Sequence, residues 1–397
     1  MKFKFQTIIK PLLLVCTALV LLTSCNKDVQ GPTPIILPTP AANSSVMFQV
    51  NTDASLTLLK AAVARAGLTA LLTDSTAGYT FFAPTDAAFQ AAGLSSTTII
   101  NAQRVGFLDT LLRYHIVGGQ TYTSSIIPSA FPNISLPSML IGVAPSAALP
   151  PGFRLPVFPS KRGTSLWVNN VPITQADITV SNGVMHKTAA LLLPPSGNLW
   201  DSRINTDANL AYFKAAVQRA DSGATASQAL IPILQNSLAS LTVFAPTNTA
   251  FQQALTAQIA AALIAQGVPS ATAQAQATAL ASTPGVFTNP AVANVLTPTV
   301  VKGLVVYHIL GVRAFSVNIP STATTIPTLL NMAAPTHPGV IIQATFSGPA
   351  VTAATVKGLV NTTASNIQIN PTPGTGTSDQ HYTNGVLHVI DQVLRPQ

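Results

Sequence analysis

The sequence contains no glutamate, so all 11 acidic residues among its 397 are aspartates. Only 8% of the residues are charged, whereas 48% are hydrophobic. The missing glutamate excludes every mechanism that needs a glutamate base, such as that of the His-Glu-x-x-His zinc hydrolases. The high hydrophobic content excludes an intrinsically disordered chain. A chain of this length can form two domains of ordinary size.

Cysteine is also scarce, with only Cys16 and Cys25 present. Residues 1–24 are typical of a signal peptide, because a basic start precedes an apolar run at 11–22 that is too short to span a membrane. Leu22-Thr23-Ser24-Cys25 resembles the bacterial lipobox, which implies that Cys25 is lipidated after cleavage. The alternative is an ordinary signal peptide followed by an unrelated cysteine. Cleavage before Cys25 removes Cys16, so no intrachain disulfide could form.

The positive charge is modest and scattered. The formal net charge is +8, and loss of the three lysines of the signal peptide leaves about +5. Lys161-Arg162 is the only adjacent basic pair, and no basic stripe with interleaved aromatics is present, which argues against nucleic-acid binding. The sequence also has no Gly-x-Ser-x-Gly elbow and no Gly-x-Gly-x-x-Gly loop. Neither a serine hydrolase nor a nucleotide-binding protein is therefore indicated.

Residues 25–43 follow the signal peptide and are rich in proline and small polar residues, which predicts a semi-extended tether. Asn26-Lys27-Asp28 resembles the surface-export signal of some Bacteroidetes lipoproteins. We therefore expect an outer-membrane lipoprotein displayed on the cell surface, with the membrane contacted only through the lipid anchor. A lipoprotein that faces the periplasm is the alternative.

The chain is organised around a repeated stretch. Residues 79–89 read Tyr-Thr-Phe-Phe-Ala-Pro-Thr-Asp-Ala-Ala-Phe, and residues 241–251 repeat the same steps. Each copy predicts a short buried strand that a proline ends, because proline cannot donate a ladder hydrogen bond. Thr85 then caps a helix, and Phe89 points back to the core. This order of features, present twice, predicts a duplicated structural unit.

Other landmarks recur around these stretches. Asn51-Thr52-Asp53 and its counterpart at 205–207 open the two copies, and we expect the aspartates to cap helices whose apolar faces are buried. Those faces comprise Leu56, Leu59, Val63 and Ala66 in the first copy and Leu210, Phe213, Val217 and Ala220 in the second, with Gly67 as a C-cap. An Asn-Gly pair near the end of each copy, at 182–183 and 384–385, predicts a hairpin.

The copies differ in their middle parts. Phe82 and Tyr114 are 32 positions apart, whereas Phe244 and Tyr307 are 63 apart. We assign the difference to a helical insertion at about 252–283, broken at Gly267-Val268-Pro269. Residues 131–160 contain many prolines and are expected to form a loop, and a strand is expected around Trp167.

Taken together, these landmarks resemble the fasciclin domain. Residues 242–247 match the family's Thr-Val-Phe-Ala-Pro-Thr, and residues 384–391 match its Asn-Gly-Val-Ile-His-Val-Ile-Asp except at Leu387. The resemblance covers 44–200 and 201–397. It implies an α+β fold of two tandem domains, each a wedge of mixed β-strands packed with helices. It also implies extracellular adhesion or interaction modules, not enzymes.

The family resemblance also points to a candidate contact site. In animal relatives, integrin contact has been assigned near a Tyr-His segment, which corresponds here to Tyr114, His115, Tyr307 and His308. Both pairs lie in apolar runs, and the histidines at 186 and 388 also correspond between the copies. Buried imidazoles bonded to backbone are the expected outcome, with metal ligation or partner contact as alternatives. No metal and no cofactor is expected.

Three functions remain open. The favoured one is a lipid-anchored, non-catalytic adhesion module that binds an extracellular protein or polysaccharide matrix. Its expected contact surfaces are the loops at 119–130, 131–160 and 312–340. The alternative is a carbohydrate-capture accessory of a glycan-uptake system, for which only Trp167 and Trp200 could stack on sugars. An unrecognised hydrolase is the third.

Overall fold

The computed structural model describes residues 44–128, 131, 133–142 and 152–397. These described residues belong to one compact unit. The expected signal peptide, Cys25 and the tether lie outside the described residues. In the part of the chain that the structure describes, none of the helices combines the length and hydrophobicity that a membrane span requires. We refer to residues 44–200 as the first half and to residues 201–397 as the second half.

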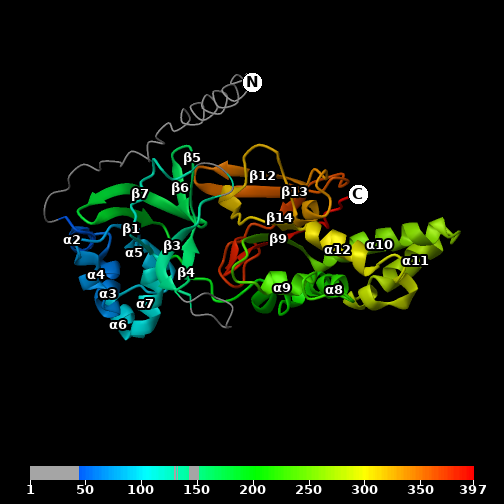
Figure 1. The fold of residues 1–397 in the computed structure, drawn as a ribbon, viewed down its shortest axis with the longest axis horizontal. Helices are drawn as coiled ribbons and strands as arrows, with labels where there is room; N and C mark the ends of the chain where they lie inside the picture. The colour runs from blue at the N-terminus through cyan, green and yellow to red at the C-terminus, as the bar shows by residue number, and fades with distance from the viewer. Residues whose placement is uncertain (1–43, 129–130, 132, 143–151) are drawn as a thin grey trace, which may run out of the picture. The chain divides into compact units, whose positions relative to one another are not determined.

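The first half is a mixed sheet with helices gathered on one face (Figure 1). Its helices are α2 (Val46–Thr52), α3 (Thr57–Ala66), α4 (Thr69–Thr73), α5 (Asp86–Ala91), α6 (Thr97–Ala102) and α7 (Val105–Tyr114). Its strands are β1 (Tyr79–Pro84), β2 (Ile116–Gly118), β3 (Leu136–Ile141), β4 (Arg154–Val157), β5 (Pro159–Arg162), β6 (Ser165–Val168), β7 (Val171–Val180) and β8 (Gly183–Thr188). They are ordered β4-β3-β2-β1-β8-β7-β6-β5.

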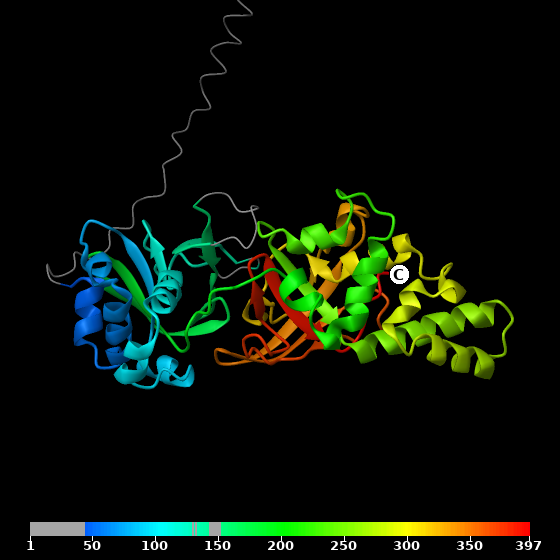
Figure 2. The ribbon, with the colours of Figure 1, turned by 90° about the horizontal axis from the view of Figure 1, so that it is seen from below.

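The second half repeats this plan with different helices (Figures 1 and 2). Its α-helices are α8 (Ala211–Ala220), α9 (Leu230–Gln235), α10 (Asn248–Ala265), α11 (Ser270–Leu280) and α12 (Pro298–Tyr307). Its strands are β9 (Leu241–Pro246), β10 (Ile309–Leu310), β11 (Thr324–Ile326), β12 (Val340–Ser347), β13 (Ala350–Lys357), β14 (Ser365–Ile367), β15 (Gln380–Tyr382) and β16 (Gly385–Ile390). The order is β10-β9-β16-β14-β13-β12-β11, with β15 paired to β16.

The repeated stretch forms a central strand in both sheets. β1 runs parallel to β8 and antiparallel to β2, and β9 has the same relation to β16 and β10. Tyr79 lies opposite Gly183, as Leu241 lies opposite Gly385. A Cβ on Gly183 would lie 2.0 Å from the carbonyl oxygen of Tyr79, so the register requires glycine there. The Asn-Gly pairs therefore close hairpins, as predicted, and also permit this close approach.

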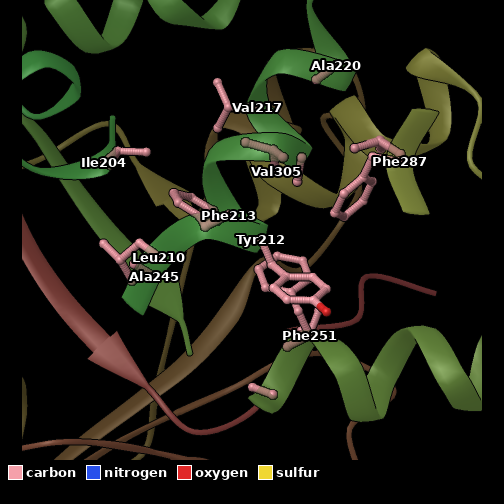
Figure 3. Close-up of a cluster of buried hydrophobic side chains, with 14 of the residues drawn as sticks. Ile204, Leu210, Tyr212, Phe213, Val217, Ala220, Ala245, Phe251, Phe287 and Val305 are labelled. Carbon is pink, nitrogen blue, oxygen red and sulfur yellow. The ribbon is translucent and has the colours of Figure 1, made fainter. Parts of the chain in front are cut away.

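Alternation along the central strand divides each core into two layers. Phe81 packs among the helices of the first half, whereas Phe82 packs on the opposite face of the sheet. In the second half Val243 and Ala245 lie on the helical side, and Phe244 lies on the other. Figure 3 shows the aromatic part of the helical-side core, where Phe213, Phe251 and Phe287 meet. Successive side chains of a strand point to opposite faces of the sheet, and both faces are covered here. All six residues of β1 and all six of β9 are therefore buried.

The predicted helix starts are confirmed where threonine follows the strand-ending proline. Thr85 accepts a hydrogen bond from the amide of Ala88, and Thr247 accepts one from that of Ala250. Gly67 ends α3 in the left-handed conformation, with φ of 74°. The Asp53 cap was wrong, because α3 begins three residues later, after Leu56. Asp53 instead accepts hydrogen bonds from Ser55 and forms a 2.5 Å ion pair with Lys187.

The loop expected at 131–160 was also wrong in part, since β3, β4 and the start of β5 lie within it. Pro137 and Pro156 lie opposite each other in the β3–β4 pair. Neither proline can donate a ladder hydrogen bond, and β4 is an edge strand, where proline is tolerated. In β3, Leu136, Ser138 and Leu140 are buried in the period of two that the prolines obscured in the sequence.

Two helices occupy the segment by which the copies differ. α10 and α11 lie side by side, separated around Gly267-Val268-Pro269, and extend away from the sheet (Figures 1 and 2). Ile259 and Ala277 join the helical-side core of the second half. These two helices therefore enlarge the helical-side core of the second half relative to that of the first half.

The first half contributes side chains of β5 and β6 to the contact between the halves, and the second half contributes the segment after β10 and the β12–β13 hairpin. Arg162 donates to the carbonyl oxygens of Val317 and Ile319 at 3.1 and 2.7 Å. Its guanidinium carbon lies 3.6 Å from the centre of the Phe346 ring. Trp167, 1% exposed, donates its indole N–H to Pro349. These hydrogen bonds and the cation–π interaction stabilise the contact between the two halves.

Candidate functional site

The Tyr-His pair of the first half lies where α7 ends and β2 begins. Tyr114 is fully buried, and its hydroxyl donates to the carbonyl oxygen of Pro156 at 2.9 Å. Asn169 donates to the same hydroxyl at 3.3 Å. Burial is the main cause that raises the pKa of Tyr114. The phenol is therefore neutral and connects α7 to β4 and to the turn after β6.

His115 connects three segments of the first half. Its Nδ1 lies 2.8 Å from the carbonyl oxygen of Leu111, and its Nε2 accepts a hydrogen bond from the amide of Leu192. Nε2 must be unprotonated to accept, so Nδ1 carries the proton. Burial lowers the pKa of His115 to about 4 and keeps the ring neutral.

The second half repeats this arrangement with different partners for the tyrosine. Tyr307 donates to the carbonyl oxygen of Gly339 and accepts from the amide of Leu359. His308 contacts the carbonyl oxygen of Leu304 through Nδ1 and accepts from the amide of Leu394 through Nε2. Burial again lowers the pKa of the histidine to about 4.

None of the four Tyr-His side chains has an exposed surface in the structure. A partner that approaches these segments would contact the loops that the four side chains anchor. Direct partner contact at Tyr114, His115, Tyr307 and His308 stays a prediction.

A second pair of histidines stabilises the other side of each central strand. His186 stacks on Phe82 at 5.6 Å, and His388 stacks on Phe244 at 5.9 Å. Each ring accepts a hydrogen bond at Nδ1, from the amide of Asp177 and of Asp379 respectively. The Nε2 atoms lie against carbonyl oxygens of Tyr122 and Ala314. These four histidines are thus bonded to backbone, as the sequence favoured.

The described residues contain no group of three or more His, Cys, Asp or Glu side chains that could hold a metal ion. The two remaining histidines have other partners: His337 lies against the carbonyl oxygen of Pro396, and His381 accepts from Arg313. Across residues 44–128, 131, 133–142 and 152–397, no hydrogen bond joins a histidine ring to a serine hydroxyl. The described residues therefore contain no serine activated in the manner of a Ser-His-Asp triad.

The second half carries an apolar groove of about 970 Å³ between α10, α12 and the last residues of the chain. Val300 and Leu359 in its wall are 50% and 53% exposed, and Met332 nearby is 83% exposed. The expected contact loop at 312–340 is less exposed than predicted. Phe315 and Ile319 are buried, so only the later part of 312–340 reaches the surface.

Two sets of residues had roles that the sequence did not reveal. Asn182 and Asn384 do more than form turns, because each buried amide bonds to helical segments more than a hundred positions away. Arg313 was passed over, although a lone arginine between Val312 and Ala314 in an apolar run was a usable signal. Its surroundings are described below.

The geometry defines a class: a duplicated α+β protein whose corresponding histidines are bonded to backbone, with an apolar groove on the second half. The chain belongs to the fasciclin domain family, whose model matches residues 54–194 and 222–396. The predicted fold class is therefore confirmed. The family is associated with adhesion and extracellular interactions and is generally non-catalytic.

Curated relatives match part of the chain. It is 33% identical over 198 residues to transforming growth factor-beta-induced protein ig-h3 of Sus scrofa, and the match covers 49% of this chain and 26% of that protein. The protein of the same name from Oryctolagus cuniculus is 30% identical over 186 residues, 45% of this chain and 24% of that protein. The match thus spans about a quarter of either relative.

A more distant relative and a solved structure complete the comparison. Aurofusarin biosynthesis cluster protein S of Gibberella zeae is 26% identical over 170 residues, which are 37% of this chain and 41% of that protein. A FAS1 domain pair from the insect cell adhesion molecule fasciclin I covers 89% of this chain and 98% of its own, at 13% identity and a TM-score of 0.33.

Proposed function

We propose that this protein is a lipid-anchored, non-catalytic interaction module of the cell envelope that binds an extracellular protein or a polysaccharide matrix. The observation that carries the proposal is the fasciclin family match in both halves of the chain. The internal bonding of the histidines supports it, because their ring nitrogens serve the fold and leave the surface for binding. The anchor at Cys25, the bacterial source in the Bacteroidetes and display on the outer membrane are parts of this proposal.

For the contact surface we propose the exposed part of 320–338 together with the loops that the Tyr-His pairs anchor. Met332 is 83% exposed there, and exposed methionine adapts to varied partner surfaces. Met332→Asp is expected to reduce attachment of cells to a matrix-coated surface. Phe107→Asp in the first half, where Phe107 is 47% exposed, controls for added charge at an exposed apolar side chain. Equal attachment by the two variants would place the contact elsewhere.

Protease shaving of intact cells tests the location. Cleavage of the second half, with a periplasmic control protein left whole, supports surface display. Protection until the outer membrane is opened would direct the search to a periplasmic partner. Cys25→Ser should release the protein from the membrane fraction if Cys25 carries the lipid.

The carbohydrate-capture alternative loses its aromatic platforms, since Trp167 and Trp200 are 1% and 5% exposed. Titration of neutral glycans with tryptophan fluorescence as the readout should therefore give no quenching. Saturable quenching would restore that alternative.

A further inference from the structure

Arg313 is a buried cation with no acidic partner among the described residues. It is 4% exposed and forms none of the ion pairs of the structure. Its Nη1 donates to Nε2 of His381 at 2.7 Å and to the carbonyl oxygen of Tyr382, and its Nη2 donates to that of Thr383. All three acceptors are uncharged. The structure does not describe the internal segments 129–130, 132 and 143–151. Their sequences contain no acidic residue that could supply a negative charge next to Arg313.

The guanidinium group is held in place yet keeps unused donors. The Phe158 ring lies 4.6 Å from its central carbon. Its buried Nε has no hydrogen-bond partner among the described residues. Three hydrogen bonds occupy three of the five N–H donors that an arginine offers, so Nε and one N–H of Nη2 remain free. A buried charge and buried donors without partners are unfavourable unless something completes them.

A cavity of about 460 Å³ lies at Arg313, and both halves form its wall. The first half contributes Phe153, Arg154 and Phe158, and the second contributes Arg313 with Ser237 and Ser240. No aspartate lines the cavity, so its wall carries two positive charges and no negative one. The first half has Thr121 at the position that corresponds to Arg313, because the amides of the next residues, Tyr122 and Ala314, donate to the equivalent threonines Thr80 and Thr242. The charge is therefore peculiar to the second half.

We propose that this cavity binds a carboxylate group, carried by a ligand of up to monosaccharide size. A carboxylate matches the fork of two N–H donors that arginine presents, and it would supply the charge and the acceptors that Arg313 lacks. Arg154 at the exposed rim adds a second cation, and the hydroxyl groups of Ser237 and Ser240 add donors for a polar ligand. The source is either a free organic acid or a uronate sugar. This site does not depend on the proposed adhesive function.

Calorimetric titration of the full chain tests the site, with chloride balancing the ionic strength. The probes are acetate, glucuronate and glucose. We expect saturable binding of glucuronate and none of glucose. Binding of acetate as well as glucuronate assigns the source to a free acid, whereas binding of glucuronate alone assigns it to a uronate sugar. Glucose binding as tight as glucuronate binding, or no carboxylate binding beyond the chloride background, overturns the proposal.

Three variants locate the binding. Arg313→Gln removes the buried charge and should abolish the binding. Arg154→Gln should weaken it about tenfold, the scale of one charge-assisted hydrogen bond. Arg65→Gln, on α3 and outside the cavity wall, should leave it unchanged. Arg154→Gln lies at an exposed position, so it decides the question even if Arg313→Gln does not fold. Unchanged affinity in Arg154→Gln would refute the assigned cavity.

Discussion

Nε2 of His115 accepts a 2.9 Å hydrogen bond from the backbone amide of Leu192, which lies 77 positions further along the chain. The same ring contacts the carbonyl oxygen of Leu111 within its own helix. One neutral imidazole thus joins the end of α7 to the segment that leaves the first half. His308 does the same between α12 and Leu394 near the end of the chain. The most recognisable pair in each repeat is therefore a connector of its domain.

Removal of this connector should destabilise the first half. His115→Ala leaves the amide of Leu192 buried without an acceptor, which costs about 1–3 kcal/mol, and it also opens a cavity. We expect a clear drop in the midpoint of urea unfolding. His337→Ala is the control, because this histidine is partly exposed, although its ring contacts Pro396, Gly339 and Tyr307, and it should lose less stability. Equal losses in the two variants would show that His115 is not a connector.

The buried histidines also predict how stability depends on pH. Burial lowers the pKa of His115 and His308 from 6.5 to about 4 in the folded state. Between these values the unfolded chain binds protons that the folded chain does not, so stability is complete above pH 6.5 and falls as the pH drops towards 4. The slope should reach about 1.4 kcal/mol per pH unit for each histidine. The hydrogen bond from Lys187 helps lower the pKa of Asp53 from 3.8 to about 2. The stability that this carboxylate contributes is therefore lost only below about pH 4.

Urea unfolding at pH 7 and at pH 5 measures this slope. A His308→Gln variant that still folds should show a smaller difference between the two pH values than the unaltered chain. A difference as large as in the unaltered chain would assign the slope to other groups.

The sequence predicted best what local chemistry determines. The central strands, the threonine caps and the C-cap at Gly67 follow from residues within a few positions of each other, and they are confirmed. The β3–β4 strands were missed because Pro137 and Pro156 contradict local strand propensity, and the edge position of β4, which tolerates Pro156, is a property of the folded sheet. The Asp53 prediction failed since its partner Lys187 is remote in sequence.

The surroundings of the candidate residues were harder to predict for the same reason. An apolar run around Tyr-His indicates burial, and burial is what the structure shows. The partners of His115 and Arg313 lie tens of positions away, so no spacing in the sequence reveals them. Residues from both halves line the cavity at Arg313, so its wall cannot be predicted from either half alone. The sequence also does not show that no aspartate is among these lining residues.

The asparagine of the second Asn-Gly pair, Asn384, should stabilise the fold beyond its role in the hairpin turn. Asn384 is fully buried, accepts a hydrogen bond from the amide of Leu199 and donates to the carbonyl oxygen of Leu234. Asn384→Ala removes both bonds and should cost about 2–4 kcal/mol, or roughly 1–2 for each buried group left unpaired. Asn366→Ala is the matched control, because Asn366 is exposed and bonds to Asp391. Thermal unfolding of both variants measures the difference, and similar melting temperatures would refute the role.

The contact between the two halves depends on Arg162, which combines two hydrogen bonds to the Val317 and Ile319 carbonyl oxygens with a cation–π contact to Phe346. Arg162→Ala should weaken this contact by about 2–3 kcal/mol while each half keeps its own core. Calorimetry should then resolve two separate unfolding transitions where the unaltered chain shows closer coupling. The adjacent Lys161 bonds only within the first half, to Ser124, so Lys161→Ala is the control. If Lys161→Ala separates the transitions as much as Arg162→Ala does, the coupling depends on the shape of β5 and not on the guanidinium group.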